Sequence, residues 1–157
     1  MSKKKGISPV IATVLLVAMV IVIGLIIFLW FKGIGGEVIT KFGGTNIEVV
    51  CGDVEFSANY VNNQLYISNN GNVPIFGIKV KVDEGASHDT YDLSTISPNW
   101  PALGLNQGGT FTSSNINSQV GSAETIMLIP VLMGNSDEGD KAYICNENQH
   151  AYELIVY

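Results

Sequence analysis

The sequence predicts a long N-terminal α-helix followed by an all-β antiparallel domain, either a sandwich or a barrel. Three observations support this fold class. Residues 7–31 contain no charged side chain. From Asn46 onward, apolar residues alternate with polar ones between turn-forming residues, which is typical of strands. The chain has 157 residues, which leaves room for one compact domain of about 110 residues beyond the helix.

The uncharged segment is long enough to cross a membrane. About 20 apolar residues at a rise of about 1.5 Å span a hydrocarbon core of about 30 Å, and this segment has 25 residues. Ser8 can cap the helix, and Pro9 suits the first turn, where an N–H would have no partner. Gly24 either lets a neighbouring helix approach closely or is simply tolerated.

Other kinds of protein share such a segment. A secretory signal peptide has a shorter apolar core and a small-residue cleavage site, whereas this segment ends in Trp30-Phe31-Lys32. A permanent single-pass anchor fits the length and the preceding lysines equally well, with the lysines in the cytoplasm. Composition alone leaves the anchor open.

The junction before the helix carries a more specific pattern. Lys3-Lys4-Lys5-Gly6 stands directly before Ile7-Ser8-Pro9-Val10-Ile11-Ala12-Thr13. This junction closely resembles the N-terminus of archaeal type IV pilins, and the resemblance extends over residues 3–31. It implies a leader peptide in residues 1–6. From the resemblance, together with the glycine boundary and the strand pattern further along the chain, we expect a pilin-like lollipop, with a hydrophobic helix and linker in 7–44 and an extracellular β-sandwich domain in 45–157.

The resemblance also implies a function. A prepilin peptidase would cut between Gly6 and Ile7, and the pilus assembly machinery would move the subunit from the cell membrane into a helical homo-oligomeric filament on the cell surface, used in adhesion or surface attachment. The filament core would be built from helices that begin at the cut. In this sequence the matching residues are Ile7, Ser8, Pro9, Val10 and Ile11, with Gly24 further along.

Two departures refine the resemblance. Bacterial type IV pilins usually carry Glu at the fifth residue of the mature helix, where this chain has Ile11. Archaellins, which form motility filaments, typically have a Gly-rich helix start instead of Ser8-Pro9-Val10. A pilin is therefore favoured, with an archaellin-type subunit and a permanently anchored extracellular binding module as alternatives.

The segment after the helix is rich in glycine. Gly33, Gly35 and Gly36 favour a helix end or hinge, because each glycine costs a helix about 1 kcal/mol relative to alanine. Residues 37–42 could form a further short helical piece before Gly43 and Gly44 mark the domain boundary.

Beyond the boundary, roughly seven to nine short strands are expected. The longest candidate, residues 73–82, should bury one face, with Pro74 at its start or on an edge and Gly77 at a bulge. The most apolar candidate, 125–133, should be the central strand, with Pro130 at a bulge or an unpaired position. A hairpin turn is expected at 61–64. The remaining candidates are 47–51, 54–60, 65–68, 90–93, 110–114, 141–145 and 151–156.

The chain has two cysteines, Cys51 and Cys145, near the two ends of the predicted β domain. An even number outside the membrane favours one disulfide, with two unpaired buried thiols as the alternative. A metal site is not expected, because neither cysteine belongs to a C-x-x-C pair and only His88 and His150 are available to help.

No catalytic or cofactor site is expected, and we predict that the chain is not an enzyme. Ser87-His88-Asp89 contains triad residue types but no nucleophile elbow. Oxygen-bearing residues at 135–140 form either a calcium loop or a plain acidic turn. Loss of three leader lysines would take the formal net charge from −6 to −9, and the chain has no arginine, so nucleic acid is not an expected partner.

Overall fold

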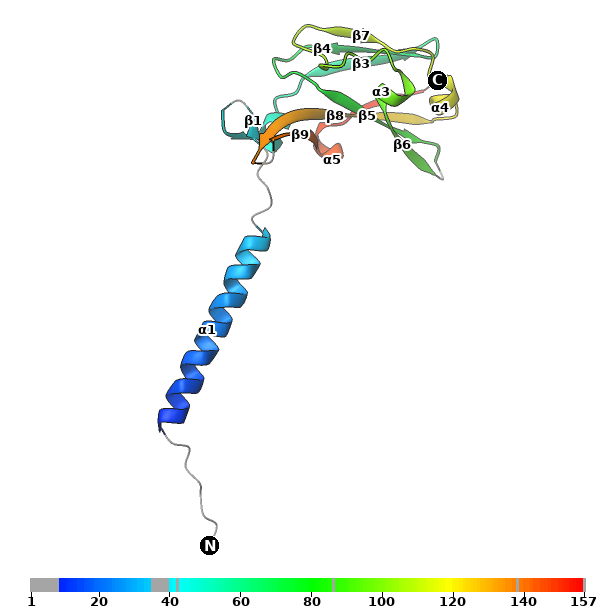
Figure 1. The fold of residues 1–157 in the computed structure, drawn as a ribbon. Coiled ribbons are helices and arrows are strands. Elements are labelled where there is room, and N and C mark those ends of the chain that lie inside the picture. The colour runs from blue at the N-terminus through cyan, green and yellow to red at the C-terminus, as the bar shows by residue number, and fades with distance from the viewer. Residues whose placement is uncertain (1–8, 35–39, 42, 86, 138, 157) are drawn as a thin grey trace. The chain divides into compact units, whose positions relative to one another are not determined.

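The computed structural model describes residues 9–34, 40–41, 43–85, 87–137 and 139–156, with side-chain surroundings from 9–30 and from 40 onward. The chain divides into two compact units, Met1–Val38 and Ile39–Tyr157 (Figure 1). The first contains the long helix α1 (Pro9–Ile34) and the second an antiparallel β domain. The predicted fold class is therefore confirmed.

Helix α1 begins at Pro9 and runs for 26 residues, through Gly33 to Ile34. Pro9 occupies the first helical position, as expected from its fixed φ and missing N–H. The proposed cap, Ser8, lies outside the described residues. So do Gly35, Gly36 and most of the possible second helical piece.

The β domain is built from two antiparallel sheets. The smaller sheet contains β3 (Phe56–Val61), β4 (Gln64–Asn69) and β7 (Thr110–Thr112), in the order β3-β4-β7. The larger sheet has seven strands: β1 (Thr40–Lys41), β2 (Thr45–Asn46), β5 (Gly77–Asp83), β6 (His88–Asp92), β8 (Thr125–Ser136), β9 (Gly139–Ile144) and β10 (Tyr152–Ile155). In the described part of the domain, the strands are connected by four short helices: α2 (Ile47–Cys51), α3 (Leu93–Ile96), α4 (Asn117–Val120) and α5 (Glu147–His150).

Strand β8 is the central strand of the larger sheet, as predicted. One edge pairs with β5 over residues 125–131 and with β1 at Asn135, and the other pairs with β10 over 125–128 and with β9 over 131–136. The break between β9 and β10 falls opposite Pro130, whose carbonyl accepts a hydrogen bond from the Cys145 N–H. In an antiparallel strand the N–H and C=O of one residue point to the same edge. Proline therefore occupies the position where the neighbouring strand is interrupted, so its missing donor disrupts no ladder.

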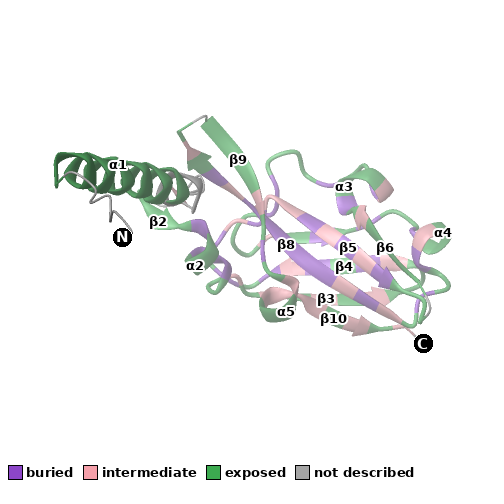
Figure 2. Cartoon of the chain, turned by 90° about the horizontal axis from the view of Figure 1, so that it is seen from below, coloured by how far each residue is buried: buried purple, intermediate pink, exposed green. Residues whose placement is uncertain are grey.

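The two sheets enclose one main hydrophobic core, which makes the domain a sandwich. Strand β5 alternates as expected, with Ile78, Val80 and Val82 buried. They pack with Leu128 of β8 and, from the smaller sheet, with residues such as Ile67. Figure 2 shows buried residues, in purple, along β8 and β5.

An aromatic pair adds to the core between the two sheets. Trp100 packs edge-on against Phe111 of β7 at a ring-centroid distance of 4.8 Å, and its indole N–H donates to the Phe76 carbonyl at 3.0 Å.

The predicted hairpin is present between β3 and β4. Asn62 and Asn63 adopt φ values of 53° and 64°, the left-handed conformation that asparagine tolerates better than most residues.

Three strand predictions were wrong. Residues 47–51 form helix α2. The segment before Gly77 is not part of β5, and Ile75 forms an isolated bridge with Leu105 instead. Leu93 begins α3 rather than ending β6. In addition, Thr40 and Lys41, which the sequence placed in the linker, form strand β1.

Candidate functional site: the apolar helix and the start of the β domain

Helix α1 is apolar on all sides. Between Pro9 and Trp30 its mean hydropathy is 3.3 over the most apolar window, and no part of that window is buried within the chain. Its large apolar side chains are exposed by between 48%, at Ile27, and 71%, at Met19. The Thr13 hydroxyl donates to the Val10 carbonyl at 2.9 Å, so this polar side chain is satisfied within the helix.

This pattern separates α1 from an ordinary surface helix. A helix that packs on its own domain has one apolar stripe and one polar face, whereas a helix that is apolar all round needs an apolar environment on every side. A lipid bilayer and the centre of a helix bundle both supply that environment. By length and composition, α1 can cross a membrane.

The residues singled out at the start of the helix are placed only in part. Gly6, Ile7 and Ser8 lie outside the described residues. Pro9, Val10 and Ile11 form the first helical positions, with Val10 and Ile11 exposed. At Gly24 an added Cβ would meet nothing within 4 Å apart from the adjoining residues and the nearby backbone of the helix itself, so no packing within the chain requires glycine there.

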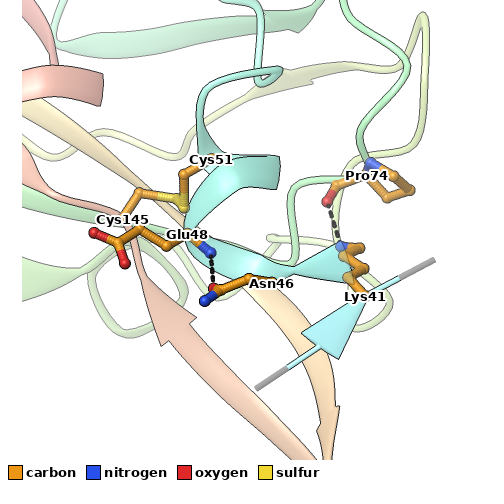
Figure 3. Close-up of a disulfide and its surroundings, with 6 residues drawn as sticks. All are labelled: Lys41, Asn46, Glu48, Cys51, Pro74 and Cys145. Carbon is orange, nitrogen blue, oxygen red and sulfur yellow. Dashed lines mark hydrogen bonds between the residues drawn. A yellow bond between two sulfur atoms is a disulfide. The ribbon is translucent and has the colours of Figure 1, made fainter. Parts of the chain in front are cut away.

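The β domain begins with a short hairpin and a helical turn. Strand β1 pairs with β2, and Asn46 then caps α2: its side-chain oxygen accepts a hydrogen bond from the Glu48 N–H at 2.9 Å (Figure 3). The buried residues of α2 are Ile47, Val50 and Cys51. These positions are spaced three and four apart, which is the helical period. The β-branched residues that dominate the segment instead favour a strand, which is why residues 47–51 were predicted as one.

Helix α2 carries one half of a disulfide. Cys51 is bonded to Cys145, which directly follows β9, with a Cα–Cα distance of 5.7 Å and a sequence separation of 94 (Figure 3). The predicted disulfide is thus present, and the alternative of two unpaired thiols is excluded. Such a bond indicates an oxidising environment, as found outside the cytoplasm.

A second, smaller hydrophobic cluster surrounds the disulfide. Both sulfur-bearing residues are buried, at 1% and 2% exposure, and they pack with residues from α2, β8 and the loop before β5. Its buried aliphatic members are Ile47, Val50, Val73 and Leu132. The start of the β domain is therefore fastened by both a covalent bond and its own core.

Lys41 lies beside this cluster in β1. Its ammonium donates to the Pro74 carbonyl at 3.3 Å (Figure 3), and partial burial lowers the pKa of Lys41 below the ordinary value for lysine. The lysine joins the first strand of the domain to the loop before β5.

The acidic turn at 135–140 is the tip of the β8–β9 hairpin. The Asn135 amide donates to the Asp140 carboxylate at 2.7 Å, so two of the possible calcium ligands bond each other. Among the described residues, no group of three or more His, Cys, Asp or Glu side chains is placed to hold a metal ion. Glu138 lies outside the described residues.

Comparison with known proteins adds little. No family model and no curated protein matches this sequence. A solved structure described as "X-ray structure of Northeast Structural Genomics Consortium target SoR45" aligns with 66% of this chain and 85% of its own, at 11% identity and a TM-score of 0.33. That score is too low to carry an argument about fold or function.

Proposed function

We propose that this chain is the structural subunit of an archaeal type IV pilus-like filament, inserted in the cell membrane as a precursor and assembled on the cell surface after removal of residues 1–6. The observation that carries the proposal is a helix that is apolar on every side. The Lys-Lys-Gly/Ile-Ser-Pro-Val-Ile junction before it adds the family resemblance.

The physical argument concerns transfer of α1 between two apolar environments. A membrane-inserted helix that moves into a bundle of identical helices exchanges lipid contacts for side-chain contacts, and residues 7–31 carry no charged side chain. Helix packing between subunits then replaces the bilayer. The disulfide and the sandwich core keep the β domain folded both before and after this transfer, because neither depends on the membrane.

The proposal predicts the first residue of the mature protein and the cell fraction in which the protein is found. Intact mass and N-terminal sequencing of the protein from its native cells should give a chain that begins at Ile7. Shearing the cells should release it as filaments. Gly6→Leu should block the cut and assembly together, whereas Gly24→Ala should leave the cut unchanged.

A permanently anchored binding module is the main competing function, since the same helix would serve it. Protein that stays entirely in the membrane fraction of cells with an intact assembly ATPase would support the anchor and contradict the filament. Normal filaments from the Gly6→Leu variant would contradict processing at this junction.

A further inference from the structure

The smaller sheet presents an outer face without any charge. Residues 56–78 and 93–123 contain no Asp, Glu, Lys, Arg or His, and the strands β3, β4 and β7 all lie within them. The outer face of the larger sheet is different. It carries Lys79, paired with Asp92 at 2.8 Å, and Lys81, paired with Glu147 at 3.0 Å.

The uncharged face is organised as two rows that cross all three strands. In one row Asn59, Tyr66 and Thr112 are direct cross-strand neighbours, and in the other Ser57, Ser68 and Thr110 are. Alternation places the partners in each row on the same side of the sheet. We call these six residues the neutral face; Glu55, just before β3, marks its end.

Hydrogen bonds hold several of these side chains in place. The Ser68 hydroxyl donates to the Asn70 amide oxygen at 3.0 Å, and the Asn70 amide donates to the Ser57 hydroxyl at 3.0 Å. The Tyr66 hydroxyl donates to Gln64, two residues back on the same face, at 3.3 Å. That bond ties the Tyr66 side chain to its own strand, and 40% of the residue is exposed.

The neutral face also has the size of a binding site. A shallow hollow of about 510 Å³ opens over it, bordered by all six residues. Ligand sites in proteins typically measure about 300 to 1,000 Å³.

From these features we infer that the neutral face binds an uncharged glycan. Sugar hydroxyls pair with serine and threonine hydroxyls and with asparagine amides, which both donate and accept. Sugar C–H groups pack against the electron-rich face of an aromatic ring such as Tyr66. An acidic glycan would meet a chain with a formal net charge of −6 and no compensating cation on this face, so the charge pattern selects neutral polymers.

A second copy of the chain fits this face less well. The buried centres of protein interfaces are enriched in aromatic residues, methionine and arginine and depleted in serine. Here four of the six residues are serine or threonine. The inference rests on the proposed function only in placing the β domain outside the cell, and it needs no filament, so the two can fail separately.

The test uses the full chain in phosphatidylcholine nanodiscs, which contain no sugar detergent. Mannan, dextran, laminarin and galactan serve as neutral probes, and hyaluronan and heparin as anionic ones, with binding measured by calorimetry and by affinity electrophoresis. We expect at least one neutral polymer to bind and neither anionic polymer to bind.

Two substitutions on the neutral face, Tyr66→Ala and Asn59→Asp, should each weaken that binding about tenfold or more. Matched controls elsewhere on the domain, Ile144→Ala and Asn148→Asp, should change it less than about twofold. Thermal unfolding monitored by circular dichroism confirms that each variant is folded.

Three results would overturn the inference. The first is failure of all four neutral polymers to bind, and the second is tighter binding of hyaluronan or heparin. The third is wild-type glycan binding by a folded Tyr66→Ala variant. If sedimentation instead showed that Tyr66→Ala abolishes association between copies of the chain while glycan binding persists, the neutral face would be a subunit contact.

Discussion

The large apolar side chains of helix α1 are exposed, whereas most of those in the β domain are buried. Leu16 of α1 is 65% exposed, whereas Leu128 of β8 is fully buried. The β domain gains its stability from contacts within the chain, with a main core, a second cluster and a disulfide. None of the most apolar part of the helix is buried within the chain, so its stability depends on the environment around it.

One chain therefore contains a region stabilised by its own contacts and a region stabilised by its surroundings. A substitution in α1 should change where the chain resides and with what it assembles, while a substitution in the β domain should change whether that domain is folded.

The largest effect is expected from the disulfide. Cys51→Ser combined with Cys145→Ser removes a cross-link across 94 positions, which the chain-entropy model values at about 4 to 5 kcal/mol of unfolding free energy. Urea unfolding in nanodiscs, followed by Trp100 fluorescence in a Trp30→Phe background, measures the loss. The circular dichroism of α1 should not change. Equal unfolding midpoints for oxidised and reduced wild-type chain would contradict the prediction.

A pair of leucine truncations tests the contrast directly. Leu128→Ala leaves a cavity in the main core and should cost the β domain about 3 to 4 kcal/mol. Leu16→Ala, the same chemical change in α1, should leave β-domain unfolding unaltered. If both variants shifted the unfolding midpoint equally, the two regions would not be independent.

A charge at the middle of α1 should act on location instead of folding. Val20→Lys lies near the centre of the apolar span and should oppose membrane insertion by about 3 kcal/mol. Val49→Lys places the same charge on the exposed side of α2 and should have little effect. Carbonate extraction of membranes, which separates inserted from peripheral protein, should release only the first variant. Equal retention of both would count against a lipid-facing α1.

The smallest effect concerns the cap of α2. Asn46→Ala removes the acceptor for the Glu48 N–H and should lower β-domain stability by about 1 kcal/mol. Asn46→Asp keeps an acceptor at the same position and should restore most of the loss. The difference is measurable as a shift in the urea midpoint, and no difference between the two variants would show that the cap contributes nothing.

The sequence predicted best those features that depend on neighbouring residues alone. The apolar run of α1, the alternation of Ile78, Val80 and Val82 and the Asn62-Asn63 turn are all local patterns, and each appears in the structure. The Pro130 position was also anticipated, because a missing N–H restricts proline wherever a sheet forms.

Features that depend on distant partners were harder to predict. The order of strands around β8 follows from pairings between residues far apart in the chain, which no local pattern reports. Segment 47–51 was misassigned because its β-branched residues suit a strand, while its cap and its buried positions favour a helix. The neutral face was missed for a related reason: two uncharged stretches become one surface only when β4 and β7 are known to be paired.

The disulfide also determines how the chain transmits a pulling force. Tension between α1 and the C-terminus follows the covalent path from Cys51 across the sulfur bridge to Cys145, so residues 52–144 carry none of it along their backbone. Fully extended, those residues would add about 300 Å to the chain. An oxidised chain can therefore lengthen only outside residues 52–144, whereas a reduced chain can also extend through the sandwich. The redox state of Cys51 and Cys145 thus sets how far the chain can be stretched.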